Sequence, residues 1–571
     1  MEQSPKLALQ PDSARYTWAR FLDDVAQRHG ESVALAVQPE PAGPWHETSY
    51  RELRARAREM ARGLIGAGVT KGSRVAVLMA NGPDWVVASF AVAGVGGVLV
   101  PVNTFATPAE RDYILRHGDA SLLLLQAGML KRDFLAELIE RHPELGEGVP
   151  GRLRCLELPH LRRILCLDAQ AVADAGVAGI EGPDALTTLG ADVPEALLDA
   201  AAAEVHPADD GLLIYTSGTT AHPKGVLHMQ RAPVIQSWRF GEDMGLGETD
   251  VVLTAQPFFW TAGIAMSLGA SLAAGARLIT EPAFEPGRFL ELIESERVTA
   301  LHAWPHQEKA MAEHPDLARR DLSSLAKIEF ASPLAPAAGL SRDTWGTYGS
   351  YGLSETFTLA SSLPASAPAE KRRGTSGLPL PGMTVRIVDP VSGAPLAGAG
   401  EKGEIAVKGL TFMRGYTKVE PELYLDEDGF FRTQDGGDLD EHGYLHWSGR
   451  LSNVIKTGGA NVSPLEIEAA LADEPAIRVA AAVGVPHPVL GEVIILCAVR
   501  AAGGEVDEKT IRAGLRTKLA AYKVPRRVLF LEADELSFTA NQKVQVAPLR
   551  ELALARLQAE GAEIDGVLYE A

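Results

Sequence analysis

Residues 212–226 constrain the fold most strongly, because a short apolar run there leads directly into a polar loop. Residues 212–215 have the composition of a buried strand, and residues 216–220 bring hydroxyl groups and a glycine shortly before Lys224. Such a loop lets backbone N–H groups approach an oxyanion, while hydroxyls and an ammonium supply further donors. The order Lys224-Gly225-Val226 differs from the Walker motif, in which Gly-Lys-Ser/Thr opens a helix. Taken alone, the segment is equally consistent with a polar surface turn.

The length of the chain exceeds what one hydrophobic core serves, so 571 residues predict three or four structural units. Hydrophobic residues make up 46% and charged residues 22%, which is ordinary for a soluble globular enzyme. No uninterrupted apolar run reaches the roughly 18–20 residues that cross a bilayer. The N-terminus lacks a basic segment leading into an apolar one. We therefore expect a cytoplasmic protein without integral membrane association.

The net charge of −20 disfavours nucleic acid and anionic membranes as partners, because no long run of Lys or Arg offsets it. If the substrates are anions, positive charge must be concentrated at the site. The lysines and arginines inside motifs are therefore the first candidates for binding and catalysis.

Cysteine and histidine spacing does not indicate a metal site. Three cysteines are scattered along the chain: Cys155, Cys166 and Cys497. Two histidine pairs have His-x-x-x-His spacing: His302 with His306, and His442 with His446. A proline interrupts the first pair and a glycine the second, so neither lies on a regular helical face. We expect buried thiols, chance histidine spacing and no structural metal.

Strand and helix patterns alternate over residues 18–125, which predicts parallel βαβ units. Residues 169–209 are rich in Ala, Gly and Asp, and we expect surface loops there. Residues 385–389 and 403–408 are expected to be antiparallel strands. A smaller α/β unit is expected from residue 480 onward.

Three further segments carry residue types suited to a nucleotide. Residues 351–356, Tyr-Gly-Leu-Ser-Glu-Thr, combine an aromatic ring, a hydroxyl and a carboxylate that suit a base, a phosphate and Mg²⁺. Asp435 and Arg450 suit the two hydroxyls of a ribose, although they are equally consistent with a surface ion pair. Residues 458–459 are a glycine pair that leaves backbone room for a thin ligand, or marks a simple turn.

Taken together and in this order, these motifs resemble the adenylate-forming superfamily of acyl-CoA synthetases, adenylation domains and luciferases. The resemblance runs from about residue 18 to 550 and includes Gly374-Thr375-Ser376-Gly377-Leu378-Pro379, Gly403-Glu404-Ile405 and Gly415-Tyr416. It implies an α/β fold with a large N-terminal domain, residues 1–451, of mixed α/β subdomains with parallel sheets and a small β-barrel-like part. A small mobile α+β C-terminal domain, residues 452–571, would follow a hinge at Ser452.

The resemblance also implies a role for individual residues. The loop that receives the ATP phosphates comprises Thr216, Ser217, Gly218, Thr219, Thr220 and Lys224. The other nucleotide positions are Ala331, Ser332 and Pro333 bordering the adenine pocket, Tyr351 stacked on adenine with Gly352 beside it, Ser354 at the α-phosphate, and Asp435 with Arg450 at the ribose. Mg²⁺ is expected at Glu355 and Thr219. Lys543 would bridge the carboxylate and the α-phosphate, and Lys456, Gly458 and Gly459 would face the thioester step. The expected catalytic residues are Lys543, Lys224, Glu355 and Lys456.

Several positions depart from the pattern of the superfamily. Ala221 replaces a usual glycine in the phosphate loop, Gln542 precedes Lys543 where glycine is usual, and Ser452 stands where Asp or Lys is commoner. Trp260 occupies a place often held by histidine beside the acyl pocket. The connection from residue 333 to 351 is short, as though a helix were trimmed.

These features predict an ATP-dependent acyl-CoA ligase that forms acyl-AMP from a hydrophobic acid and passes the acyl group to CoA, as in fatty acid metabolism. The acyl pocket is expected to be lined by Phe258, Trp260, Thr261 and Gly263. Alternatives are a carrier-protein phosphopantetheine as acceptor, a ligase specialised for thioesterification from acyl-AMP, and a non-catalytic nucleotide-binding module, against which Lys456 and Lys543 argue. The expected partners are a carboxylic acid, ATP and CoA, and the chain is expected to be a monomer or homodimer.

Overall fold

The computed structural model describes residues 16–40, 43–216, 223–457, 460–519, 521–538 and 544–570. Contacts within the chain divide it into two compact units. The first comprises Met1–Val385 and Val407–Phe431, and the second comprises Arg386–Ala406 and Arg432–Ala571.

A seven-stranded sheet organises the N-terminal half of the first unit. Its order is β19 (Gly415–Tyr416), β10 (Lys224–Met229), β9 (Asp210–Thr216), β4 (Val98–Pro101), β3 (Arg74–Leu78), β5 (Leu122–Leu125) and β8 (Arg163–Cys166). From β9 through β8 neighbouring strands run parallel, while β10 pairs antiparallel with both β9 and β19. The parallel sheet confirms the fold class predicted from the alternating pattern.

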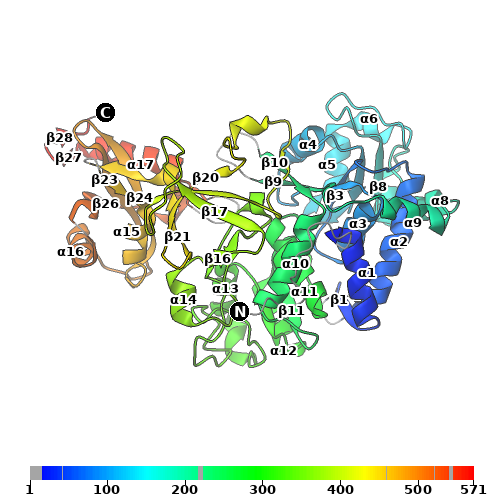
Figure 1. Cartoon of the computed structure of the whole chain (residues 1–571), viewed down its shortest axis with the longest axis horizontal. Coiled ribbons are helices and arrows are strands. Elements are labelled where there is room, and N and C mark those ends of the chain that lie inside the picture. Colours follow the sequence, from blue (N-terminus) through cyan, green and yellow to red (C-terminus); the bar gives the residue numbers. More distant parts are fainter. Residues whose placement is uncertain are drawn as a thin grey trace. The chain divides into compact units, whose positions relative to one another are not determined.

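Both faces of this sheet are covered by helices, which explains why its strands are continuously apolar. Val75 and Val77 pack with α1 (Trp18–His29), α2 (Tyr50–Gly66), α3 (Pro83–Gly94) and α10 (Arg231–Asp243). Ala76 and Leu78 face the opposite way, toward α4 (Pro108–His117) and α5 (Phe134–Arg141). Figure 1 shows the two helical layers on either side of β3 and β8.

The ends of these helices follow local capping chemistry. Ser49 caps α2 by accepting a hydrogen bond from the backbone N–H of Glu52, as the Ser-x-x-Glu pattern predicts. Thr107 and Glu110 form a complete capping box at the start of α4.

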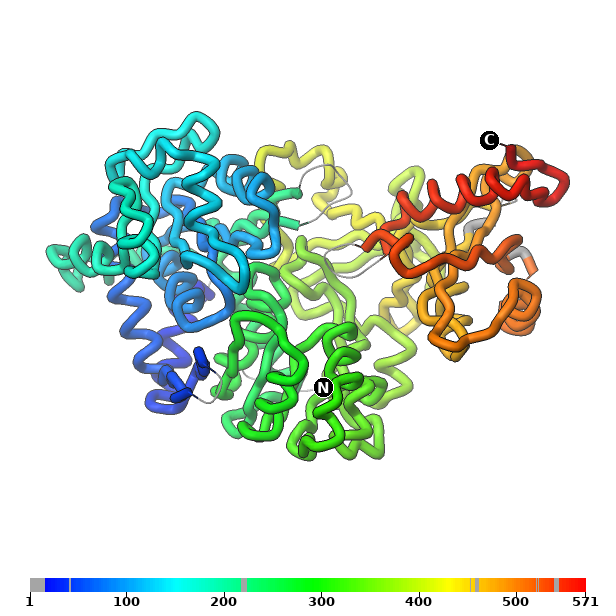
Figure 2. The backbone as a smooth tube through the Cα atoms, turned by 180° about the vertical axis from the view of Figure 1, so that it is seen from behind, coloured from blue at the N-terminus to red at the C-terminus, as the bar shows by residue number. Residues whose placement is uncertain are grey.

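A second sheet, of five strands, carries the central part of the first unit; in Figure 2 its strands from residues 251–302 are green and its two strands from residues 33–49 are blue. Its order is β13 (Ala300–His302), β11 (Val251–Thr254), β12 (Arg277–Thr280), β1 (Val33–Val37) and β2 (His46–Ser49). The first four strands are parallel and β2 is an antiparallel edge. Helices α12 (Pro286–Ser295) and α13 (Pro305–Ala312) contribute to the apolar cluster around Leu253 and Ile279.

The expectation of surface loops at residues 169–209 is wrong. This segment forms α7 (Ala169–Ala175), α8 (Asp184–Gly190) and α9 (Glu195–Ala203). Alanine favours helix, and Leu186 and Leu198 are buried in the same apolar cluster as α2. The packing of α8 on α2 is so close that a Cβ on Gly63 would lie 2.6 Å from the carbonyl oxygen of Leu186. Tertiary burial thus decides the structure of a segment whose composition is typical of loops.

The second unit contains most of the antiparallel strands. The strands expected at residues 385–389 and 403–408 are confirmed, in the sheet β17 (Met383–Val388), β18 (Gly403–Gly409), β20 (Phe431–Leu439) and β21 (Leu445–Arg450). A further sheet has the order β23 (Ala460–Val462), β22 (Ile455–Thr457), β25 (Gly491–Arg500) and β24 (Ile477–His487), with β26 (Arg527–Phe530) parallel to β25. Helix α17 (Val546–Glu560) packs on one face of this sheet, and α15 (Pro464–Ala470) and α16 (Glu508–Lys518) pack on the other.

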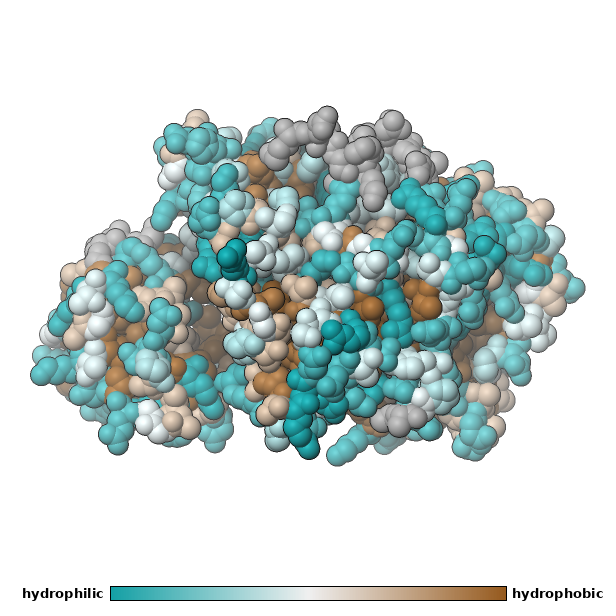
Figure 3. All heavy atoms as spheres, turned by 90° about the horizontal axis from the view of Figure 1, so that it is seen from below, coloured by the Kyte–Doolittle hydropathy of each residue, from teal (hydrophilic) through white to brown (hydrophobic). Residues whose placement is uncertain are grey.

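On the face drawn in Figure 3 hydrophilic side chains predominate, and hydrophobic ones show mainly in the recesses between them. Within the described ranges, no helix combines the length and apolar character that crossing a membrane requires.

Candidate active site

The phosphate-loop candidates lie at the open end of the β9–β10 hairpin. Thr216 ends β9 and Lys224 begins β10, and the two residues are directly paired across the antiparallel ladder. The hairpin therefore holds Thr216 and Lys224 on either side of the intervening loop. Ser217, Gly218, Thr219, Thr220 and Ala221 lie outside the described residues, as do Gly458, Gly459, Gln542 and Lys543.

Tyr416 connects two of the predicted catalytic residues. The ammonium nitrogen of Lys224 lies 5.0 Å from the centroid of the Tyr416 ring, within cation–π range. The phenol of Tyr416 donates a hydrogen bond of 2.5 Å to Oε1 of Glu355. The pairing of Tyr416 with Val226 places the ring next to β10. Lys224 and Glu355, 131 residues apart in the numbering of the chain, thus approach the same aromatic side chain from different elements.

The segment that carries Glu355 is tightly folded around Gly352. A Cβ on Gly352 would lie 1.8 Å from the carbonyl oxygen of Thr358, so only glycine fits. The carbonyl of Leu353 accepts hydrogen bonds from the N–H groups of both Thr356 and Thr358. Phe357 and Thr358 have φ values of 49° and 91°, in the left-handed region that non-glycine residues rarely adopt. Consecutive residues of this kind beside a carboxylate are typical of functional sites.

Two buried polar side chains hold the backbone of this segment by hydrogen bonds, and neither is among the site residues predicted from the sequence. His228 Nε2 donates a 2.9 Å hydrogen bond to the carbonyl of Ser354, while Gln236 Nε2 donates to the carbonyls of Thr356 and Leu359. Burial lowers the pKa of His228 to about 3, so the imidazole is neutral and its proton lies on Nε2. A histidine in the apolar strand that follows Lys224 is the only signal in the sequence that points to this support.

The adenine-pocket candidates differ in exposure. Tyr351 in β14 (Ser350–Tyr351) and Ser332 are buried, whereas Ala331 and Pro333 are exposed. The side chain of Ser332 hydrogen-bonds Glu308, whose pKa is raised above its usual range by burial. Residues 320–349 form no helix, which agrees with the short connection noted in the sequence.

The predicted acyl-pocket residues share one loop and the helix that follows it: Phe258, Trp260, Thr261 and Gly263. Phe258 is fully buried, and its N–H donates a 2.9 Å hydrogen bond to Oδ1 of Asn81. Trp260 is half-buried and makes edge contacts with Phe259 and with the exposed ring of Phe105. A Cβ on Gly263 would lie 1.9 Å from a backbone carbonyl oxygen, so the loop closes tightly there.

A π-helix, Gly263–Gly269, follows this loop, and such helices are frequent at functional sites. Inside it, the hydroxyl of Ser267 donates to Gln256 and lies 3.1 Å from Nδ1 of His302. Burial lowers the pKa of His302 to about 4, so this network is uncharged. The His-x-x-x-His spacing of His302 does not predict this support, which depends on the fold.

In the second unit, Asp435 and Arg450 are directly paired between β20 and β21. Arg450 Nε lies 2.9 Å from Oδ1 of Asp435, whose carboxyl is almost entirely buried while the guanidinium is half-exposed. Arg450 also donates to the carbonyl of Thr433. Lys456 lies in β22 with an exposed side chain, and its N–H donates to a carboxylate oxygen of Glu492. Ser452 lies in the 3₁₀ turn Leu451–Asn453.

Comparison with known proteins confirms the resemblance. Residues 22–417 match the family described as AMP-binding enzyme, and residues 466–543 match the AMP-binding enzyme C-terminal domain. A feruloyl-CoA synthase from Amycolatopsis sp is 33% identical over 506 residues, which cover 88% of this chain and 93% of that protein. An indoleacetate–CoA ligase from Aromatoleum aromaticum is 30% identical over 524 residues, covering 89% and 94%.

Among solved structures, ATP-bound MatB from Rhodopseudomonas palustris is 27% identical, with a TM-score of 0.72 over 94% of this chain and 98% of that one. The similarity thus extends through both matched regions of the sequence. The chain belongs to the family of AMP-binding, adenylate-forming enzymes, in its branch of AMP-forming acid–CoA ligases.

Proposed function

We propose that this enzyme activates a hydrophobic carboxylic acid in two steps at one site. In the first, a carboxylate oxygen attacks the α-phosphorus of ATP, the bond to the β-phosphate oxygen breaks, and pyrophosphate leaves. In the second, the sulfur of CoA attacks the acyl carbon and loses its proton, while AMP leaves with the oxygen it received. Because the anhydride is labile, its delivery to the thiol should avoid bulk water.

The observation that carries this proposal is the contact of Lys224 with the ring of Tyr416 and of Glu355 with its hydroxyl. The first step joins two anions, so its barrier is largely electrostatic and is lowered by fixed positive charge. Lys224 at the mouth of the hairpin suits the β- and γ-phosphates. The ring of Tyr416 contacts the ammonium of Lys224, and its hydroxyl holds the carboxylate of Glu355.

The donor set at Glu355 fits Mg²⁺, which prefers carboxylate and hydroxyl oxygens. One oxygen of Glu355 is oriented by Tyr416, and Thr219 is the second ligand expected from the sequence. The ion, when bound, would offset the charge of the phosphates. Ser354, whose carbonyl is held by His228, would then present its hydroxyl to the α-phosphate.

The second unit would supply the ribose site and the two remaining lysines. Asp435 has the buried carboxylate that a ribose diol requires, and the contact with Arg450 orients it. We place Lys543 at the α-phosphate in the first step and Lys456 at the CoA thiol step. A domain boundary at residues 451–452, with Ser452 as the hinge, would let each lysine serve in turn.

The acid is proposed to be hydrophobic because the aromatic side chains of Phe258, Phe259 and Trp260 gather in the acyl loop. The names of the relatives above refer to feruloyl and indoleacetate groups, which are aromatic acids. Aromatic, alicyclic and fatty acids all suit such a surface, and a fatty acid is therefore one of the three candidate classes of substrate. A carrier-protein pantetheine in place of CoA is the second candidate acceptor, because it presents the same thiol arm.

The proposal is tested by incubating the protein with ATP, Mg²⁺, CoA and a panel of such acids, with mass spectrometry of acyl-AMP, acyl-CoA and AMP. Replacing CoA by a pantetheinylated carrier protein distinguishes the two acceptors. Lys543→Ala should abolish acyl-AMP formation yet still convert supplied acyl-AMP to acyl-CoA, and Lys456→Ala should do the reverse. Failure of every acid to give an adenylate or a thioester would overturn the assignment.

A further inference from the structure

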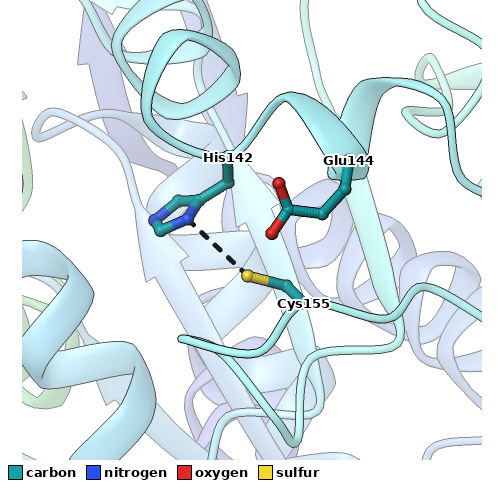
Figure 4. A group of neighbouring side chains, drawn as sticks. All are labelled: His142, Glu144 and Cys155. Atoms are coloured by element: carbon teal, nitrogen blue, oxygen red, sulfur yellow. Dashed lines mark hydrogen bonds between the residues drawn. The ribbon is translucent and has the colours of Figure 1, made fainter.

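A histidine, a carboxylate and a cysteine converge on one point far along the chain from the catalytic motifs. Nδ1 of His142 lies 3.6 Å from Sγ of Cys155, and ligand atoms of His142, Glu144 and Cys155 all lie within 4.8 Å of one another. Figure 4 shows the three side chains pointing toward a common centre. His142 and Cys155 are buried, while Glu144 is exposed.

The backbone presents these side chains from structured positions. His142 lies between α5 and α6 (Pro143–Gly146), its N–H donates to the carbonyl of Leu138, and its own carbonyl accepts from the N–H of Leu145. Cys155 lies on the loop that leads to β8, and this loop is closed by a hydrogen bond from Leu153 to Arg162. The corner between two helices and a separate loop therefore meet at this cluster.

The other nitrogen of His142 has an acidic neighbour. Nε2 lies 3.2 Å from Oδ1 of Asp112, and Asp112 is held in turn by Arg141. A carboxylate behind a histidine is the arrangement that orients imidazole ligands in metal sites and raises their basicity. Asp112 is itself buried, so its position does not depend on solvent.

We propose that His142, Glu144 and Cys155 bind one Zn²⁺ ion through Nδ1, a carboxylate oxygen and the thiolate. Imidazole, carboxylate and thiolate are the three ligand types that zinc combines in tetrahedral sites. With Zn–N near 2.0–2.1 Å and Zn–S near 2.3 Å, a tetrahedral angle places N and S about 3.6 Å apart. The observed separation of 3.6 Å matches this geometry. The thiol releases its proton on binding, and the +2 ion is then balanced by one thiolate and one carboxylate.

In the proposed site the fourth ligand is a water molecule, which would enter from the side of the exposed carboxylate of Glu144. A surface pocket of about 690 Å³ is lined by Cys155 together with Leu153, Leu156 and Pro159, among other residues. Such a pocket provides an entry path toward the thiol. The ion would tie the α5–α6 corner to the loop before β8, which assigns it a structural role.

A cysteine nucleophile is the competing interpretation, because Cys155, His142 and Asp112 lie in a row. However, only 5% of the surface of Cys155 is exposed, so its thiol is not open to a substrate. A catalytic cysteine requires an accessible thiolate at neutral pH. Zinc binding needs neither reactivity nor access for a substrate.

The test uses the full chain, freed of metal with a chelator and titrated with Co²⁺ as an optical probe for zinc. We expect one equivalent to produce tetrahedral d–d bands and a thiolate-to-cobalt charge-transfer band, and Zn²⁺ to displace both. Cys155→Ser should abolish the charge-transfer band, whereas Cys166→Ser, at another buried free cysteine, should retain it. Glu144→Gln, at an exposed position, should weaken binding by roughly tenfold or more.

Zn²⁺ should also raise the melting temperature of the wild type and of Cys166→Ser but not of Cys155→Ser. If Cys155→Ser does not fold, the decision passes to Glu144→Gln, which removes no buried group. A wild-type titration without a thiolate band, a band that survives in Cys155→Ser, or unchanged affinity in Glu144→Gln would overturn the proposal. Adenylation by the zinc-free protein, assayed with Mg²⁺ supplied, is expected to be unaffected, so the outcome is independent of the proposed function.

Discussion

Replacing Gly352 with alanine would place a methyl carbon 1.8 Å from the carbonyl oxygen of Thr358. Ordinary van der Waals contact begins at 3.4 Å, so the backbone at residue 352 and the backbone at Thr358 must separate by about 1.6 Å. Because Gly352 lies three residues before Glu355, the carboxylate would move with the turn. A displacement of about 1 Å in a catalytic group costs about 10²-fold in rate. We therefore expect Gly352→Ala to reduce adenylation by about 10²-fold and to destabilise the protein by about 1–3 kcal/mol.

The assay is pyrophosphate release from ATP in the presence of an accepted acid, together with a thermal melt. Gly247→Ala is the matched control, because a Cβ there meets no atom within 4 Å, and it should keep activity within about twofold. If Gly352→Ala adenylates within a few-fold of the wild type, the turn does not position Glu355 as described.

Two further predictions concern buried polar groups. Tyr416→Phe removes the hydrogen bond to Glu355 but keeps the ring beside Lys224. It should slow adenylation by about tenfold or more, because a hydrogen bond to a charged group contributes about 1.5–3 kcal/mol. Tyr416→Leu, which also removes the ring, should slow adenylation further, and equal rates for both variants would exclude a role for the ring. Burial lowers the pKa of His228 to about 3 and that of His302 to about 4, so both are neutral in the folded protein. In the unfolded chain the same two histidines take up protons below about pH 6.5. The free energy of unfolding should therefore fall as the pH decreases from 6.5 toward 4. The combined slope approaches roughly 2.7 kcal/mol per pH unit, measurable by urea unfolding, and a His228→Gln variant with an unchanged slope would contradict this account.

Much of the fold follows from patterns that neighbouring residues share. The strands at residues 74–78 and 122–125 are apolar on both faces because helices cover both sides of the sheet. Local sequence does not predict the helices at residues 169–203, because their alanines and glycines are also common in loops. These helices are stabilised by the burial of Leu186 and Leu198 in the apolar cluster that contains α2. Helix formation there depends on a surface that lies more than 100 residues earlier in the chain.

In the candidate site too, the sequence predicts individual residues but not how they contact one another. Motif order predicts Lys224 and Glu355, and the structure places both at Tyr416. That the ring of Tyr416 lies between them depends on the pairing of β19 with β10, which no local pattern specifies. The cluster of His142, Glu144 and Cys155 has irregular spacing for the same reason, because its loop folds back onto the α5–α6 corner.

The path of one oxygen atom tests the central claim most directly. An accepted acid labelled with ¹⁸O in both carboxylate positions is converted with ATP and CoA, and the nucleotide product is analysed by mass spectrometry. If the carboxylate attacks the α-phosphorus, the product is AMP carrying one ¹⁸O, because the bridging oxygen leaves with the phosphate. Unlabelled AMP, or ADP with the label in phosphate, would contradict adenylate formation.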